Sequence, residues 1–239
     1  MASHALLNNI DHKDLKIDTK KSAEFGNNKM FSVLYPFEFK HAQADYPIFF
    51  FKDGKTNDFV AIALFGFEEN ENLFLTNEHW QASYIPMMIE REPFLIGTQI
   101  HEENGVKTES QVIHIDLNNP RVNKEVGNDI FLPHGGNSEY INRVSAILKS
   151  IHDSKTATDQ FMQAITELEL LEPFNLDIQL NNGTNNRLSG FYTINEDKLA
   201  NLNGVQLEKL NKSGMLSVIY MVIASHANIN ALIQKKDNQ

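Results

Sequence analysis

The chain contains no cysteine among its 239 residues. Disulfides, thiolate zinc sites, iron–sulfur clusters and cysteine nucleophiles are therefore excluded. Positive charge is scarce as well, because 21 Lys and Arg stand against 31 Asp and Glu and give a formal net charge of −10. This balance repels phosphate backbones and anionic lipid surfaces, so we expect no nucleic-acid partner.

Long apolar runs and targeting signals are also missing. The most apolar stretch, residues 215–224, is far shorter than the roughly 20 residues that span a bilayer. Residues 1–21 show no basic segment followed by an apolar one, so no signal peptide is visible. We expect a protein without a membrane span that is located in the cytoplasm, with export by another route left open.

The common nucleotide and hydrolase motifs are absent too. The sequence has no Gly-x-Gly-x-x-Gly, no Walker A motif and no Gly-x-Ser-x-Gly elbow. No cofactor is expected from the motifs that remain.

The residues that are present can build a core, since 41% are hydrophobic and 10% aromatic. Strand-like runs come first and helical patterns follow. This order predicts an α+β fold with an antiparallel β-rich N-terminal lobe and a helical C-terminal lobe that carries a short β-hairpin. We expect a partly packed tail over residues 1–28, the β-rich lobe over 29–120 and the helical lobe over 121–239, packed as one unit.

The predicted strands are rich in β-branched and aromatic residues and are separated by turn signals. Asp53-Gly54 and Asn104-Gly105 each lie between two such runs and favour hairpins, hence antiparallel pairing. The expected strands are 31–35, 47–51, 59–65, 73–75, 94–101 and 111–117, with a later hairpin over 174–180 and 187–194.

The helical lobe shows apolar residues at helical spacing behind capping residues. Ser138 is expected to cap a helix over 141–151, Ser154 or Thr158 one over 161–171, and Asn195 a short one to Leu199. A last helix from Ser213 to about residue 233 is apolar all round between residues 215 and 224, so we expect it to be the central packing element of the lobe, touching the helices at 141–151 and 161–171. His226 within it should form a hydrogen bond inside the lobe.

The segment from the only tryptophan, Trp80, to Phe94 is unlike any regular element. It contains Tyr84-Ile-Pro86 and Arg91-x-Pro93, and each proline removes a backbone donor and makes the preceding residue extended. We expect Trp80 and Phe94 to be buried.

The chemistry of this segment allows two roles. Arg91 is expected to bind backbone carbonyls, Glu78 or Glu90. If the segment instead meets a partner, Trp80, Tyr84, Arg91 and Phe94 are the candidate binding residues.

One pattern indicates metal chemistry. His114 and Asp116 share a face of a predicted strand, as the His-x-Asp of a non-haem iron site does. A further histidine would be required, from His134, His152 or His226. The more common alternative is an exposed strand pair.

Taken in order, several short motifs resemble one family across nearly the whole chain. They are Glu38-Phe39, Tyr46-Pro47-Ile48-Phe49, Trp80 with Tyr84-Ile-Pro86, Arg91-x-Pro93-Phe94, Leu170-Leu171-x-Pro173 and Gly190-Phe191-Tyr192-x-Ile194-Asn195-Glu196. This set resembles the bacterial SapC-like family, which is associated by name with surface-layer proteins and is distinct from the peptide-transport permease of the same name.

The resemblance brings no established reaction. We expect a non-catalytic binding or accessory protein whose partner is another protein, linked to the surface layer or cell envelope. The alternative is a non-haem iron-dependent oxygenase, or a partner of one, that uses His114 and Asp116. The sequence leaves open the ligand, the oligomeric state and whether any reaction is catalysed.

Overall fold

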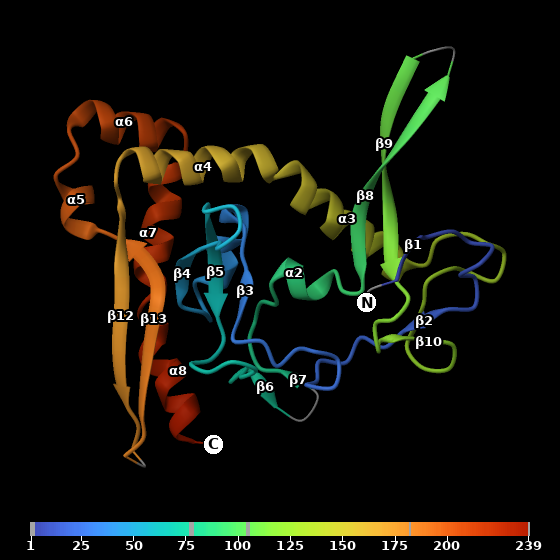
Figure 1. The fold of residues 1–239 in the computed structure, drawn as a ribbon, viewed down its shortest axis with the longest axis horizontal. Coiled ribbons are helices and arrows are strands. Elements are labelled where there is room, and N and C mark those ends of the chain that lie inside the picture. The colour runs from blue at the N-terminus through green and yellow to red at the C-terminus, as the bar shows by residue number, and fades with distance from the viewer. Residues whose placement is uncertain (1–2, 77–78, 104–105, 182, 239) are drawn as a thin grey trace. The chain divides into compact units, whose positions relative to one another are not determined.

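The computed structural model describes residues 3–76, 79–103, 106–181 and 183–238 (Figure 1). The chain divides into two compact units, each assembled from two separated stretches. Residues 1–27 and 89–153 form the first unit, and residues 28–88 and 154–239 form the second. These units differ from the predicted segments 1–28, 29–120 and 121–239, because each unit takes both strands and helices from distant parts of the sequence.

The first unit contains a three-stranded antiparallel sheet in the order β1–β9–β8. β8 (Phe94–Glu103) and β9 (Val106–Asp116) form the hairpin predicted from the sequence, whose predicted turn, Asn104-Gly105, lies outside the described residues. β1 (His4–Leu6) pairs only with residues 114–116 of β9. In Figure 1 the green ribbon of β8 and β9 therefore extends well past β1.

Helix α3 (Glu139–Asp153) covers the core of this unit. The Ser138 hydroxyl accepts the N–H of Ile141 at 3.2 Å, which confirms the predicted cap. A smaller sheet consists of β10 (Val122–Asn123), β2 (Lys16–Ile17) and β11 (Asn128–Asp129). The buried core residues are Ile17, Phe94, Ile115, Ile130, Phe131, Tyr140, Ile141, Val144 and Leu148.

The second unit is built on a five-stranded antiparallel sheet in the order β12–β13–β4–β5–β3. Its strands are β12 (Leu171–Gln179), β13 (Asn185–Ile194), β4 (Ile48–Lys52), β5 (Phe59–Leu64) and β3 (Phe31–Val33). The hairpins β4–β5 and β12–β13 were both predicted. The predicted strand at 73–75 is wrong, because residues 73 and 74 lie in a turn and only β6 (Leu75–Thr76) pairs, with β7 (His79–Trp80).

Phenylalanine rings join the strands of this sheet on one face. Phe31, Phe51 and Phe191 come from three strands, with ring centroids 5.7 to 6.2 Å apart. Phe49 lies 4.6 Å from Phe174 in the same set. Aromatic pairs at these separations are favourable beyond the apolar area that they bury, so they fix the order of distant strands.

The helices of the second unit are short. They are η1 (Pro36–Glu38), α1 (Phe39–Ala42), α4 (Lys155–Glu167), α5 (Glu196–Ala200), α6 (Gly204–Lys212), α7 (Met215–Ser225) and α8 (Asn228–Asp237). Helix α2 (Met87–Glu90) lies where the chain leaves the second unit for the first. The Asn195 side chain accepts the N–H of Lys198 at 2.7 Å, which confirms the predicted cap of α5.

The C-terminal helix differs from its prediction. Ser213 ends α6, and α7 begins after Gly214, which has a positive φ of 76°. Only one face of α7 is buried, through Ile219, Val222 and Ser225, while Tyr220 is 54% exposed. α7 packs mainly against β4, β13, α1 and α6, which are not the partners predicted.

The C-terminal residues were predicted to be too short an apolar stretch to span a membrane. By length and composition alone, residues 215–237, 23 in all, are long and apolar enough to cross a bilayer, so that reason for excluding a membrane span does not hold. The helix that packs on the core of a soluble protein passes the same test. Ile219 and Val222 have no exposed surface, because they pack within the second unit.

The fold class itself is confirmed as α+β. The sheets are antiparallel and lie mostly in the first half of the sequence, while the longer helices and one hairpin follow in the second half.

Candidate binding groove

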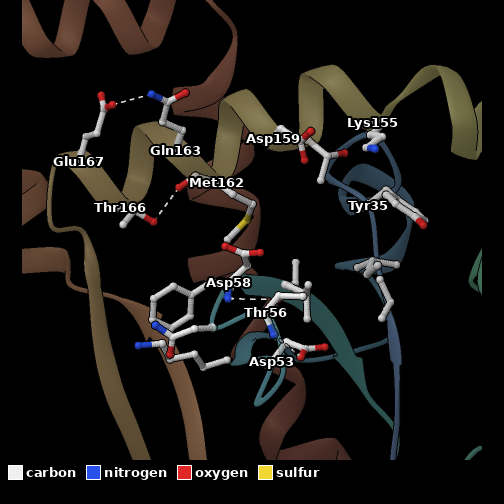
Figure 2. A pocket seen from close by; sticks show the side chains of 18 residues that line it. Tyr35, Asp53, Thr56, Asp58, Lys155, Asp159, Met162, Gln163, Thr166 and Glu167 are labelled. Atoms are coloured by element: carbon white, nitrogen blue, oxygen red, sulfur yellow. Dashed lines mark hydrogen bonds between the residues drawn. The ribbon is translucent and has the colours of Figure 1, made fainter.

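A cavity of the second unit lies between one face of α4 and the β4–β5 hairpin (Figure 2). Its volume is about 960 Å³, and it is open to solvent along one side. We call it the α4–β5 groove. Its walls are the 52–61 segment, the end of β3 at residues 33–35, and α4 from Lys155 to Glu167.

Helical spacing brings the α4 residues to this wall. Lys155, Asp159, Met162 and Thr166 lie three or four positions apart, so they share one side of the helix. Figure 2 shows them on the part of α4 that faces the hairpin. This wall of the groove is therefore one continuous helix face, which is polar except for the thioether of Met162.

The opposite wall is a turn held by its own side chains. The Asp53 carboxylate accepts the N–H groups of Lys55 at 2.7 Å and Thr56 at 3.1 Å. These two bonds lower the pKa of Asp53 below its ordinary value. Asn57 adopts a positive φ of 64°, which asparagine tolerates better than most residues. The turn thus presents an ionised carboxylate at a fixed place.

Charge in the groove is predominantly negative. Asp53, Asp58, Asp159 and Glu167 supply four carboxylates, against the two ammonium groups of Lys52 and Lys155. The Lys52 ammonium lies 5.4 Å from the centre of the Phe59 ring, so it is partly engaged by that ring. The floor between these groups is apolar, with Val33, Leu34, Val60 and Ala61.

Backbone register leaves one strand edge open beside the floor. Asp53 donates its N–H to Asp58 at 2.8 Å, and Leu34 donates to Ala61 at 2.9 Å. By alternation, Phe59 points its N–H and C=O to the same side as Ala61, toward β3. β3 ends at Val33 and the chain turns into η1, so no described strand pairs with Phe59 on that side.

One buried hydroxyl in the groove is unsatisfied. Among the described residues, the Thr158 hydroxyl on α4 has no hydrogen-bond partner although the atom is buried. Its neighbours on the helix are satisfied: the Gln163 amide donates to Glu167 at 2.6 Å, and Thr166 donates to the Met162 carbonyl at 2.8 Å.

Two of the predicted binding residues, Trp80 and Tyr84, lie elsewhere in the second unit. The Trp80 indole N–H donates to the Tyr46 hydroxyl at 2.7 Å, and its ring meets Phe65 edge-on at 5.1 Å. The Tyr46 hydroxyl donates in turn to the carbonyl of Tyr84. Trp80 was predicted to lie on the buried side of the β-rich lobe; it is half-buried and keeps some exposed surface.

A buried carboxylate explains why the Tyr84 segment is held. Glu38 is 1% exposed and accepts the Tyr84 hydroxyl at 2.7 Å and the N–H groups of Met87 at 2.9 Å and Tyr35 at 2.9 Å. Burial raises the pKa of the Glu38 carboxyl, and these three donors oppose that rise. Asp45 also accepts from the N–H of Tyr84, at 3.1 Å. Trp80 and Tyr84 thus hold the fold, and their role in binding stays a prediction.

The other two predicted binding residues, Arg91 and Phe94, belong to the first unit. The Arg91 guanidinium donates to the Phe94 carbonyl at 2.6 Å, which confirms that it binds a backbone carbonyl. Phe94 has no exposed surface, as predicted, and its ring lies 6.1 Å from that of Tyr140. Neither residue lines the groove. A binding role for Arg91 stays a prediction.

The metal alternative gains no support from the residues around His114 and Asp116. The Asp116 carboxylate accepts the N–H groups of Ser3 and Asn118, each at 3.1 Å. The His114 ring covers Gly97 of the neighbouring strand. Within the part of the chain that the structure describes, no three His, Asp or Glu side chains come together in a way that could hold a metal.

His226 forms hydrogen bonds inside its own unit, as predicted. Its Nε2 lies 3.2 Å from both the Ile48 carbonyl and the Thr193 hydroxyl. The ring stacks on Phe49 at 5.0 Å. Burial lowers the pKa of His226, and the bond to Ile48 opposes that shift. The residue therefore joins α7 and α8 to the sheet.

Sequence reasoning missed the α4–β5 groove. The available signal was the one-sided placement of Lys155, Asp159 and Glu167 beside Met162 on the predicted helix, together with a turn rich in Asp and Asn. A polar helix face usually points to solvent, so this pattern indicates a groove only when the segment that forms the opposite wall is known.

Comparison with known proteins identifies the family. The SapC family model matches residues 7–232, nearly the whole chain, so the chain belongs to the SapC family. No curated protein and no solved structure matches it.

Proposed function

We propose that this SapC family protein is a non-catalytic binding or accessory protein that holds an extended, positively charged segment of another protein in the α4–β5 groove. The observation that supports this best is the combination of an apolar floor, a mainly acidic rim and an open strand edge in one cavity. The family name associates SapC with surface layers, so the partner we propose is a surface-layer or other cell-envelope protein.

The open edge favours an extended segment. Phe59 offers one N–H and one C=O toward the groove, and a peptide strand can pair with them as β3 pairs with the rest of β5. Side chains of such a strand alternate between the floor and solvent. Every second side chain of the peptide would then lie against the apolar part of the groove.

The rim favours positive charge. Asp53, Asp58, Asp159 and Glu167 outnumber the two lysines, and the whole chain carries −10. The field of such a protein attracts cations before contact and repels acidic segments.

A defined probe tests the proposal. A short labelled peptide of alternating valine and lysine should bind the protein, as measured by fluorescence anisotropy, and a valine–glutamate peptide should not. Asp159→Lys should weaken the lysine peptide about tenfold, roughly 1.4 kcal/mol, because it reverses a charge in the wall. Added salt should weaken binding in the same direction.

Glu125→Lys is the matched control. Glu125 is exposed in the first unit, and its replacement changes the net charge by the same amount without touching the groove. Equal weakening by both variants would mean that only net charge matters, and the groove would lose its role. The same conclusion would follow if both peptides bound alike.

A further inference from the structure

The outer edge of β8 is exposed over the part of the hairpin that lies beyond β1. In the order β1–β9–β8, no strand among those described pairs with β8 on its outer side. β8 contains no proline and no lysine, and its two acidic residues, Glu102 and Glu103, come after Ile100, so residues 94–100 include none of the charged residues or prolines that usually protect such an edge. Ile100, on this edge, is 61% exposed. An isolated two-stranded ribbon is only marginally stable in water, so this edge gains from a partner.

The register shows which backbone groups are free. Asp116 donates its N–H to the Pro93 carbonyl at 3.1 Å, and the pairing continues from there without a shift. Residues 95, 97 and 99 therefore face β9, and by alternation Ile96, Thr98 and Ile100 face outward. These three residues also share one face of the ribbon.

This outward set is self-complementary. If two copies of β8 run antiparallel with Thr98 opposite Thr98, then Ile96 of one copy lies opposite Ile100 of the other. All three outward positions then fall in hydrogen-bonded pairs, and the exposed Ile100 packs against an isoleucine. No charged side chain lies between Phe94 and Ile100, so no like charges face each other.

We propose that the protein forms a two-fold symmetric dimer through antiparallel pairing of its β8 strands, centred on Thr98. The partner of this edge is a second copy of the chain, and the result is one sheet that runs through both molecules. A contact of so few residues is smaller than a stable interface requires. The dimer should therefore form only at high protein concentration.

The absence of cysteine makes the symmetry axis directly testable. In a hydrogen-bonded antiparallel pair the two Cα atoms lie about 5.5 Å apart, within the range that a disulfide bridges. Thr98→Cys should therefore form a covalent dimer under mild oxidation, faster as protein concentration rises.

Gln111→Cys is the matched control. Gln111 lies directly across from Thr98 on β9 and is also exposed. In the proposed dimer its two copies are three strand spacings apart, roughly 14 Å, too far for a disulfide. A Thr98→Cys chain that cross-links no faster than Gln111→Cys overturns the proposal, because random collision would explain both.

A second variant tests the edge without a disulfide. Ile100→Lys places a charge on the edge in each copy, while the lysine can pair with Glu109 across its own hairpin and keep the ribbon intact. In sedimentation equilibrium the parent should gain weight-average mass with concentration and this variant should not. A parent protein that stays monomeric would overturn the proposed dimer, and the β8 edge would then be available only to a strand of a different protein.

Discussion

The Trp80 indole N–H donates to the hydroxyl of Tyr46 at 2.7 Å, and that hydroxyl has no exposed surface. Because the same hydroxyl donates to the Tyr84 carbonyl, one phenol oxygen holds both ends of the 80–84 segment next to the start of β4. The proline-rich block thus depends on a residue far earlier in the sequence.

Tyr46→Phe should destabilise the protein by about 1–3 kcal/mol, because it leaves the Tyr84 carbonyl and the Trp80 N–H without their partner. Urea unfolding followed by tryptophan fluorescence measures the change, since Trp80 is the only tryptophan. Tyr220→Phe removes an exposed hydroxyl and should change stability by less than about 0.5 kcal/mol. Equal losses from both variants would contradict the proposed role of Tyr46.

Glu38→Gln should change how stability depends on pH. Burial raises the pKa of the Glu38 carboxyl above its ordinary value of 4.5, so the folded state holds the proton more tightly than the unfolded state. The group therefore withdraws stability as pH rises from 4.5 toward the raised pKa. Glutamine does not titrate, so the free energy of unfolding of the parent minus that of Glu38→Gln should fall as pH rises through this window. Urea unfolding at several pH values measures it.

Glu69→Gln serves as the control for that experiment, because Glu69 is exposed. Its difference from the parent should show no comparable fall. If the free energy of unfolding of the parent minus that of Glu38→Gln stays constant or rises with pH, the direction argued for Glu38 is wrong.

Gly97→Ala should be destabilising, because a Cβ built at this position lies 2.8 Å from the Cδ2 and Nε2 atoms of His114. Displacing the imidazole should cost about 1–3 kcal/mol. In a His114→Ala background the same change should cost little, since the obstructing ring is gone. A double-mutant cycle by urea unfolding measures this coupling, and simple additivity would refute it.

Arg121→Lys should destabilise the first unit almost as much as Arg121→Met. The buried guanidinium donates to the carbonyls of Asp18 at 3.1 Å and Lys20 at 2.6 Å, and to the Asn27 side chain at 2.5 Å. An ammonium keeps the charge but cannot reach three acceptors in one plane. Each acceptor left without a donor costs about 1–3 kcal/mol. Calorimetry tests this, and near-parent stability of the lysine variant would contradict it.

Local patterns were enough to predict the hairpins but not the units. Runs such as 47–51 and 59–65 around Asp53-Gly54 carry their own pairing signal, and they form β4 and β5. The pairing of β1 with β9, or of β4 with β13, depends on which distant surfaces fit, and no turn residue encodes it. The sequence therefore predicted elements well and their grouping poorly.

The groove escaped prediction for the same reason. Asp159 and Asp53 are far apart in the sequence, and each alone belongs to an ordinary solvated surface. The Trp80 block drew attention through its unusual composition, yet its partners, Glu38 and Tyr46, come from a separate segment. Composition indicates that a segment is fixed, and only the packing shows what fixes it.

The discontinuous build of the two units has a consequence during synthesis. β4 is synthesised long before β13, so the five-stranded sheet cannot be completed until Phe191 of β13 is available to pair with Phe51 of β4. The first unit is completed in between, from residues 89–153 and the start of the chain. Pairing between such distant segments slows folding, because the entropy of closing a long loop is lost before the contacts that stabilise the sheet can form. During synthesis the first unit can therefore form before β13 has been made, while β4 still exposes an unpaired aromatic edge, and we expect the chain to be most prone to aggregation in this interval.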